Sequence, residues 1–321
     1  HHLGGDEEVP HAGRGHHLGL AHLRHADPDG AGRHLAAGDL RAQQPIESPM
    51  QLKLACESNP GNIVVLNQAV KIQGGIRYPF SEQVLTGCTI ILGPNAKLET
   101  EEISMTFAGP LVIQSSQETE MKLTRTFLSA QSVNLNLTAV SSAIEMVFSQ
   151  IDATAGGLVI AMGDQGKLTV KNRLVPGPLE ALTAATTVQI RGGSQLTAEL
   201  SEMRISAPQG IDIAMNGAEG LLKISTAWLT SDQGNIRISS SDAKGSVDLS
   251  FTNLVFGNMG SLRLAGSDSH VKLQQVGILG VHGAPDAPGG ILIETGVGGE
   301  GGSIEASDSA FYNAVSVTLR A

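Results

Sequence analysis

The chain has 321 residues, of which 21 are Lys or Arg and 31 are Asp or Glu, so its formal net charge is −10 at pH 7. This acidic balance argues against nucleic acid as a partner, because phosphate binding needs clustered Lys and Arg. No apolar run approaches the roughly 18 residues that would indicate a transmembrane helix. We therefore expect no membrane span.

Residues 1–50 differ in composition from the rest of the chain. Residues 1–49 hold eight of the ten histidines and contain no Lys, Asn, Phe, Tyr or Trp. They show neither helical nor strand periodicity, and so predict a disordered, His-rich extension. His22 and His25 would lie near one another on a helical turn, but the abrupt change of composition before Met50 favours a tag-like extension. We expect no metal site and no cofactor.

The two cysteines, Cys56 and Cys88, lie in the segment 51–97, which we interpret as the N-terminal cap and first turns of the ordered region. Two interpretations are open. The cysteines form a disulfide in an oxidising compartment, or they are two small buried apolar residues. The sequence contains no CxxC pair, so a thiol redox site or a cysteine-based zinc site is not expected.

From residue 98 to residue 321 a pattern of about 24 residues returns. Each repeat begins with two apolar residues spaced by one, and a lone aliphatic residue follows five positions later. A glycine then opens a further alternating pair, in QGIDIAM, QGNIRIS and MGSLRLAG. The leading pairs are Ala198/Leu200, Leu222/Ile224, Val247/Leu249 and Val271/Leu273, and the lone aliphatics are Ile205, Leu229, Leu254 and Ile278.

This pattern predicts three short strands in each repeat. Residues at i and i+2 face the same side of a strand, and a step of five reverses the side, so the chain must bend before the lone aliphatic. We expect the glycine to form another corner because glycine tolerates positive φ. Stacked repeats of this kind bury one continuous core. The fold class is therefore all-β, a single-stranded parallel β-helix of roughly ten turns.

Two other architectures are less compatible with the pattern. Helical repeats are excluded because the apolar residues almost never recur at i, i+3 and i+4. A β-sandwich also has short alternating strands, but it has no reason to keep one constant period.

The register predicts where loops interrupt the coil. The second members of the leading pairs are Leu98, Leu123, Met146, Val170, Leu200, Ile224, Leu249, Leu273 and Ala306. Successive steps are 23–25 residues long except for two steps of 30 and 33 residues. The long steps predict insertions at 175–187 and 279–290, both at the corner between the lone aliphatic and the glycine-led strand. Insertions in solenoids often form a binding face.

The sequence ends in AVSVTLRA, inside a predicted strand. An open strand edge at this point leads us to expect either a piece of a longer coil or end-to-end self-association.

Few residues point to chemistry. Hydrolysis of a glycoside needs two carboxylates close together, but Asp212, Asp232, Asp242, Asp248 and Asp268 occupy different positions of the repeat, so no catalytic residue is named. His282 and Asp286 share the second insertion and are candidate binding residues. Phe127 and Trp228 each precede a lone aliphatic, so we expect them to face outward as candidate binding residues. They stand about four turns apart, which is too sparse for an aromatic ladder that stacks sugars.

The segments QGNIRIS, GGLVIAM, PGGILIETG and GGSIEASDSAFYN resemble the repeat region of filamentous-haemagglutinin-type bacterial surface exoproteins. The resemblance covers residues 95–321, although repeats in that family are often shorter. It implies a right-handed β-helix, an extracellular or cell-surface location, and an adhesive or scaffolding role with a glycan or a cell surface as partner.

Two functional hypotheses follow. The first is a non-catalytic, extracellular structural or adhesive solenoid. The alternative is a polysaccharide-active β-helix enzyme, a lyase or a glycoside hydrolase, whose site lies beside the two insertions.

Overall fold

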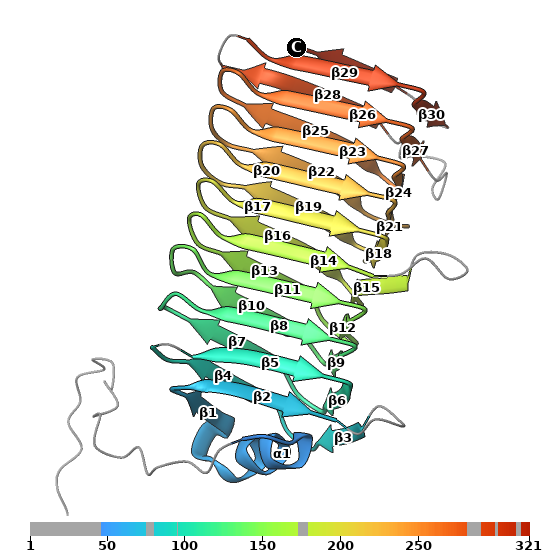
Figure 1. Cartoon of the computed structure of the whole chain (residues 1–321). Coiled ribbons are helices and arrows are strands. Elements are labelled where there is room, and N and C mark those ends of the chain that lie inside the picture. The colour runs from blue at the N-terminus through green and yellow to red at the C-terminus, as the bar shows by residue number, and fades with distance from the viewer. Residues whose placement is uncertain are drawn as a thin grey trace, which may run out of the picture. The chain divides into compact units, whose positions relative to one another are not determined.

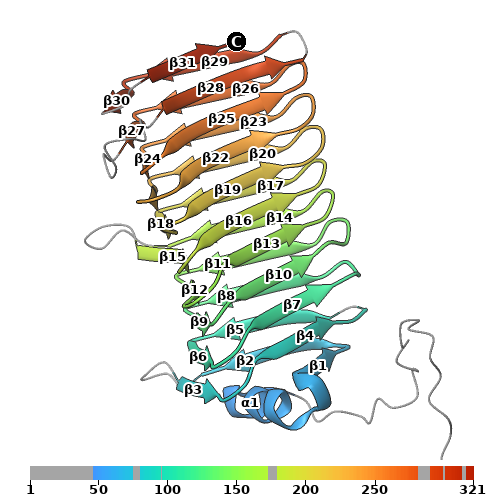
Figure 2. The same ribbon diagram turned by 180° about the vertical axis from the view of Figure 1, so that it is seen from behind.

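The computed structural model describes residues 46–74, 80–94, 96–172, 179–280, 290–298, 301–312 and 316–321. These residues belong to one compact unit, Pro45–Ala321. The unit is a parallel β-helix in which each strand pairs with the strand three places further along the chain. This pairing forms three parallel sheets of 11, 10 and 10 strands (Figures 1 and 2). The predicted fold class is confirmed.

Each turn contributes one strand to each sheet. The first sheet holds β1 (Ile63–Leu66), β4 (Cys88–Leu92), β7 (Leu111–Ser115), β10 (Val133–Leu137), β13 (Leu158–Met162), β16 (Thr187–Gly192), β19 (Gly210–Met215), β22 (Asn235–Ser240), β25 (Met259–Ala265), β28 (Gly290–Val297) and β31 (Ser316–Arg320). The second sheet holds β2 (Ala69–Gln73), β5 (Lys97–Glu101), β8 (Glu120–Thr124), β11 (Ala143–Val147), β14 (Lys167–Lys171), β17 (Thr197–Ser201), β20 (Leu221–Ser225), β23 (Ser246–Ser250), β26 (His270–Gln274) and β29 (Ser303–Ser307). The third sheet holds β3 (Phe80–Val84), β6 (Ile103–Phe107), β9 (Phe127–Ala130), β12 (Gln150–Ala153), β15 (Leu179–Ala184), β18 (Met203–Ser206), β21 (Trp228–Ser231), β24 (Asn253–Phe256), β27 (Gly277–Gly280) and β30 (Ala310–Tyr312).

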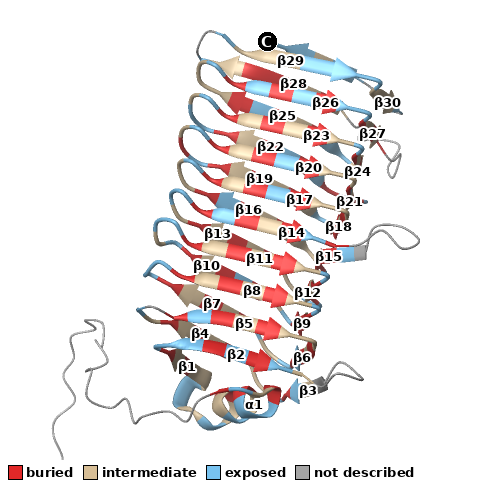
Figure 3. Ribbon diagram, viewed as in Figure 1, coloured by how far each residue is buried: buried red, intermediate tan, exposed pale blue. Residues whose placement is uncertain are grey.

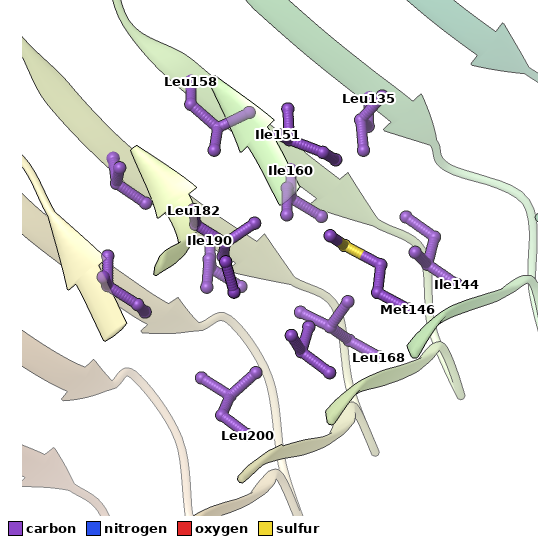
Figure 4. Packing of buried hydrophobic residues seen from close by; sticks show 14 of the residues in the cluster. Leu135, Ile144, Met146, Ile151, Leu158, Ile160, Leu168, Leu182, Ile190 and Leu200 are labelled. Atoms are coloured by element: carbon purple, nitrogen blue, oxygen red, sulfur yellow. The ribbon is translucent and has the colours of Figure 1, made fainter. Parts of the chain in front are cut away.

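The core runs through the inside of the coil. Buried and more exposed residues alternate along the strands (Figure 3), and Leu222 and Ile224 stack on Val247 and Leu249 as the sequence predicted. Figure 4 shows buried aliphatic side chains from successive strands packed together in the interior. Full burial of one such side chain stabilises the fold by roughly 1.5–3 kcal/mol, so the stacked turns hold one another in place.

One member of the predicted register is wrong. Leu98 pairs with Met121, and it is Thr100 that pairs with Leu123. Thr100 is buried and its hydroxyl lies 2.8 Å from the hydroxyl of Thr126, so the polar group is satisfied inside the coil. A search for apolar pairs passes over such a threonine.

A helix that the sequence analysis did not predict covers the first turn. Helix α1 (Pro49–Ser58) begins with a capping box between Ser48 and Gln51, and it buries Pro49, Leu52 and Cys56. A short 3-10 helix, η1 (Pro60–Asn62), follows. The expected boundary at residue 50 is therefore wrong, since ordered structure begins by residue 46; residues 1–45 lie outside the described residues. No helix of the described residues is long and apolar enough to span a bilayer.

A disulfide joins this cap to the coil. The sulfurs of Cys56 and Cys88 are 2.08 Å apart, linking α1 to the first residue of β4. Of the two interpretations of the cysteines, the structure has the disulfide.

Most of the glycines at the start of first-sheet strands do not have the positive φ that the sequence led us to expect. Among the glycines at or next to the start of first-sheet strands, Gly210 has positive φ, whereas Gly157, Gly234, Gly260 and Gly290 do not. At Gly234, a Cβ atom would collide with the carbonyl oxygen of Gln209 in the preceding turn. The left-handed corner residues between the second and third sheets are not glycines, with φ of 47–55°: Glu102, Arg125, Phe148, Glu202, Thr226, Phe251, Gln275 and Asp308.

The two insertions fall at different corners, contrary to the prediction. Residues 179–184 form β15 and β16 begins at Thr187, so the first interruption is 173–178, between the second and third sheets. The second interruption is 281–289, between β27 in the third sheet and β28 in the first. Leu182 supplies the inward aliphatic of this turn, because it pairs with Ile151 and Ile205. Both interruptions therefore adjoin strands of the third sheet.

Candidate binding faces

The outer face of the second sheet carries a column of alternating charge. Going from turn to turn, the central outward residues are Lys71, Glu99, Lys122, Glu145, Thr169, Glu199, Lys223, Asp248, Lys272 and Glu305. The sign of the charge reverses from each residue to the next, except that Thr169 takes the place of one cation. Opposite charges on neighbouring strands attract, whereas like charges would repel. The column therefore favours the observed stacking register.

Charged residues of the second sheet, inside and beside this column, make direct contacts along the stacking direction. Lys122 Nζ lies 3.0 Å from Glu145 Oε2, and Lys97 Nζ lies 2.9 Å from Glu120 Oε2. The hydrogen bond that Lys122 donates to Glu145 raises the pKa of Lys122, and the hydrogen bond that Lys97 donates to Glu120 raises the pKa of Lys97. Many charged side chains of the second sheet are thus paired with one another, so fewer of them are free to bind a partner.

A second chain of contacts follows the corner between the first and second sheets. Ser141 Oγ donates to Gln165 Oε1 at 3.2 Å, and Gln165 Nε2 donates to Gln195 Oε1 at 3.1 Å. Gln195 Nε2 then donates to Glu219 Oε2 at 2.9 Å, and Lys244 Nζ lies 3.4 Å from Glu219 Oε1. The hydrogen bond from Gln195, followed by Lys244, lowers the pKa of Glu219. The polar side chains at this corner therefore also bind one another from turn to turn.

Replacing Glu219 with Gln is expected to reduce the loss of stability on acidification. The pKa of Glu219 is lower in the folded chain, so its contribution is present at neutral pH and lost as the pH falls through about 4.3 toward that lowered value. Urea unfolding at pH 7 and pH 3 measures the effect. The free energy of unfolding of the wild type should exceed that of Glu219→Gln at pH 7 only, and only slightly, because the Glu219 side chain is exposed; an equal difference at both pH values would contradict the assignment.

On the first sheet, two arginines bind the same buried glutamate. The side chain of Glu294 is only 9% exposed, and its carboxylate lies 3.3 Å from Nε of Arg263 and 2.8 Å from Nη1 of Arg320. These arginines occupy the strands on either side of Glu294. Their charge is largely compensated inside the face.

The third sheet gathers the exposed aromatic residues. Among the described side chains, the exposed aromatics are Phe148, Trp228, Phe251 and Tyr312. Trp228 and Tyr312 belong to third-sheet strands, and Phe148 and Phe251 stand at the corners that lead into this sheet. Partly or fully exposed hydrogen-bonding residues of the third sheet include Ser104, Thr106, Gln150, Ser206, Thr230 and Asn253. Aromatic rings among hydrogen-bonding side chains are typical of a surface that contacts sugars.

The predicted candidates Phe127 and Trp228 stand on this face but do not meet. Trp228 is 41% exposed and Phe127 is partly buried. Phe127 opens β9 and Trp228 opens β21, four strands along the sheet, which corresponds to roughly 19 Å at 4.8 Å per strand. They cannot hold one sugar ring between them.

Trp228 has a charged neighbour that the sequence analysis missed. The guanidinium carbon of Arg204 lies 5.1 Å from the centroid of the Trp228 ring, a cation–π contact. The two residues are direct partners on β18 and β21. They are 24 residues apart, one repeat, so the period itself contained the signal.

The remaining candidates do not assemble into a site. His282 and Asp286 lie outside the described residues. Of the acids considered for catalysis, Asp212 belongs to the first sheet and Asp248 to the second, while Asp232, Asp242 and Asp268 lie between strands. Asp212 is flanked by Gln189 and Arg237, and Asp248 by Lys223 and Lys272. Within the described ranges, no three His, Cys, Asp or Glu side chains cluster as metal ligands would.

Comparison with known proteins finds no family model, no curated protein and no solved structure that matches this chain. Of the three outer faces, that of the third sheet differs most from the other two, because the exposed aromatic residues gather on it and at its corners.

Proposed function

We propose that this chain is a non-catalytic, extracellular structural or adhesive β-solenoid that contacts glycans through the outer face of its third sheet. The observation that carries the proposal is the gathering of the exposed aromatics Phe148, Trp228, Phe251 and Tyr312 on this face and at the corners that lead into it. Rings bury apolar area against the C–H face of a sugar, and neighbouring hydroxyl and amide groups bond its hydroxyls.

Three further features support this proposal. Charged and polar side chains of the second sheet and of its corner with the first sheet bind one another from turn to turn, as expected of a surface that stabilises the stacked turns. A disulfide persists in oxidising compartments such as the cell exterior. The repeat segments also resemble those of filamentous-haemagglutinin-type surface proteins, for which an adhesive role is expected.

Glycan binding is expected to fall roughly five- to tenfold in each of the variants Trp228→Ala and Phe251→Ala, because each loses one stacking platform. A panel of immobilised bacterial and host polysaccharides, read by biolayer interferometry, provides the measurement. Val140→Ala is the matched control, since Val140 is 53% exposed but lies between β10 and β11, away from the third sheet. Equal losses in all three variants, or no binding by the wild type, would contradict the proposal.

The same preparations test the non-catalytic part of the proposal. Incubation with a bound polysaccharide should release neither new reducing ends nor unsaturated products. Release of either would favour the hydrolase or lyase alternative. Sedimentation velocity on these samples checks the self-association that the sequence led us to expect.

A further inference from the structure

We infer that Arg204 and Trp228 form a subsite for a sugar that carries a carboxylate, such as a uronic acid. The inference rests on the proposed function, because it names the class of glycan that the third sheet would hold. It starts from the surroundings of the Arg204 side chain.

Arg204 has no acidic partner, unlike three other arginines of the coil, and it is the one described arginine that lies over an aromatic ring. Arg125 lies 3.1 Å from Glu102, and Arg263 and Arg320 share Glu294. Within the described residues, the guanidinium of Arg204 makes no ion pair and no hydrogen bond, and its Nε is buried without a partner. The guanidinium is therefore held by the Trp228 ring, and its remaining donors are the two terminal nitrogens.

The contact between Arg204 and Trp228 fixes both groups before any ligand binds. A guanidinium that lies against an indole ring loses rotational freedom, so less entropy is lost when it captures an anion. Its paired N–H groups match the two oxygens of a carboxylate and can bond both at once. The exposed part of the Trp228 ring lies beside them as an apolar platform.

The next turns leave room beside this platform. Asn253 follows Trp228 on the neighbouring strand, and Gly277 follows Asn253. The side-chain oxygen of Asn253 occupies the space that a side chain at Gly277 would fill. The Asn253 amide therefore leans away from Trp228, where it is placed to bond a sugar hydroxyl. One charged group, one ring and one amide lie along three successive strands.

Charge complementarity identifies the occupant. The chain carries a net charge of −10, so a polyanion is repelled by most of the surface and needs a local cation that is not already paired. Glu180, the strand partner of Arg204 on the other side, is exposed and makes no ion pair with it. A neutral glycan would use the ring but gain nothing from the guanidinium. A carboxylate-bearing sugar uses both.

The test compares oligogalacturonate with its fully methyl-esterified form, which has the same sugar rings without the charge. Wild type should bind the acidic form at least fivefold more tightly, and Arg204→Gln should bind it about tenfold more weakly and lose the preference. Arg204→Lys, which keeps the charge but not the fork, should fall between them. Arg237→Gln is the matched control, because Arg237 is an exposed arginine that stands on the first sheet.

Failure of this inference can be told apart from failure of the proposed function. Loss of glycan binding in Trp228→Ala with an unchanged Arg204→Gln would overturn the carboxylate subsite and leave the adhesive role standing. Equal weakening by Arg237→Gln would show a general charge effect and also overturn the subsite. Equally tight binding of polyglutamate would show that a carboxylate alone is recognised, without a sugar. Absence of binding to both oligosaccharides and to every other glycan would overturn both proposals.

Discussion

Replacement of both Cys56 and Cys88 with alanine is expected to lower the free energy of unfolding by about 3–4 kcal/mol. The disulfide closes a loop with a sequence separation of 32, and without it the unfolded chain gains the corresponding conformational freedom. It also ties α1 to β4, one turn beyond β1, so its loss frees the cap from the coil. Urea unfolding followed by circular dichroism measures the change.

The control for this prediction is Leu54→Ala. Leu54 lies on α1 but is 52% exposed, so its replacement should change the stability by less than about 0.5 kcal/mol. Reduction of the wild-type disulfide should reproduce the effect of the double variant. A loss below about 1 kcal/mol in both cases would mean that α1 covers the first turn without help from the disulfide, contrary to the loop-closure estimate.

The cap shows where periodicity alone is insufficient. Helix α1 is one short helix with only three buried residues, so it produces no sustained 3.6-residue pattern. Its start signal was nevertheless present, because Ser48 followed by Pro49 and Gln51 is a capping box with proline in the first turn. A search for caps before repeats would have found the helix.

The coil itself was predictable because inward residues repeat and are apolar. Ile205, Leu229, Leu254 and Ile278 do form one inward row of the third sheet. The prediction failed where that row was followed forward into the first insertion, because this placed the insertion at 175–187, after the lone aliphatic residue of its turn. Counting back from the strand that opens at Thr187 reaches Leu182 instead, because the distance from the lone aliphatic to the next strand stays nearly constant.

The outer faces were less accessible to the same reasoning. Trp228 was identified because an outward aromatic is unusual, but Arg204 was passed over as one of many surface charges. Its importance appears only when the register places it against the Trp228 ring. The alternating column from Lys71 to Glu305 was hidden for a similar reason, since neighbours in the column are some 24 residues apart in sequence.

Replacement of Gly234 with alanine is expected to destabilise the coil by about 2–3 kcal/mol. The φ of Gly234 is not in the left-handed region, so the effect is steric and not conformational. The new methyl group would overlap the carbonyl carbon and oxygen of Gln209 and approach the amide nitrogen of Gly210, all of them backbone atoms of the preceding turn. Because backbone cannot rotate away as a side chain can, the two turns must separate locally and weaken the ladder between β19 and β22.

Gly290→Ala isolates this steric effect, because Gly290 opens a first-sheet strand and Gly234 directly precedes one. Its nearest neighbour would be the Ser316 hydroxyl at 3.3 Å, a side chain that can swing aside. This variant should be neutral or stabilised by up to about 1 kcal/mol, since alanine restricts the unfolded chain more than glycine does. Urea midpoints compare the two, and hydrogen exchange should show faster opening at Ile211 and Ile236 in Gly234→Ala. Equal midpoints in the two variants would mean that corner glycines are needed for chain flexibility and not for the close approach of stacked turns.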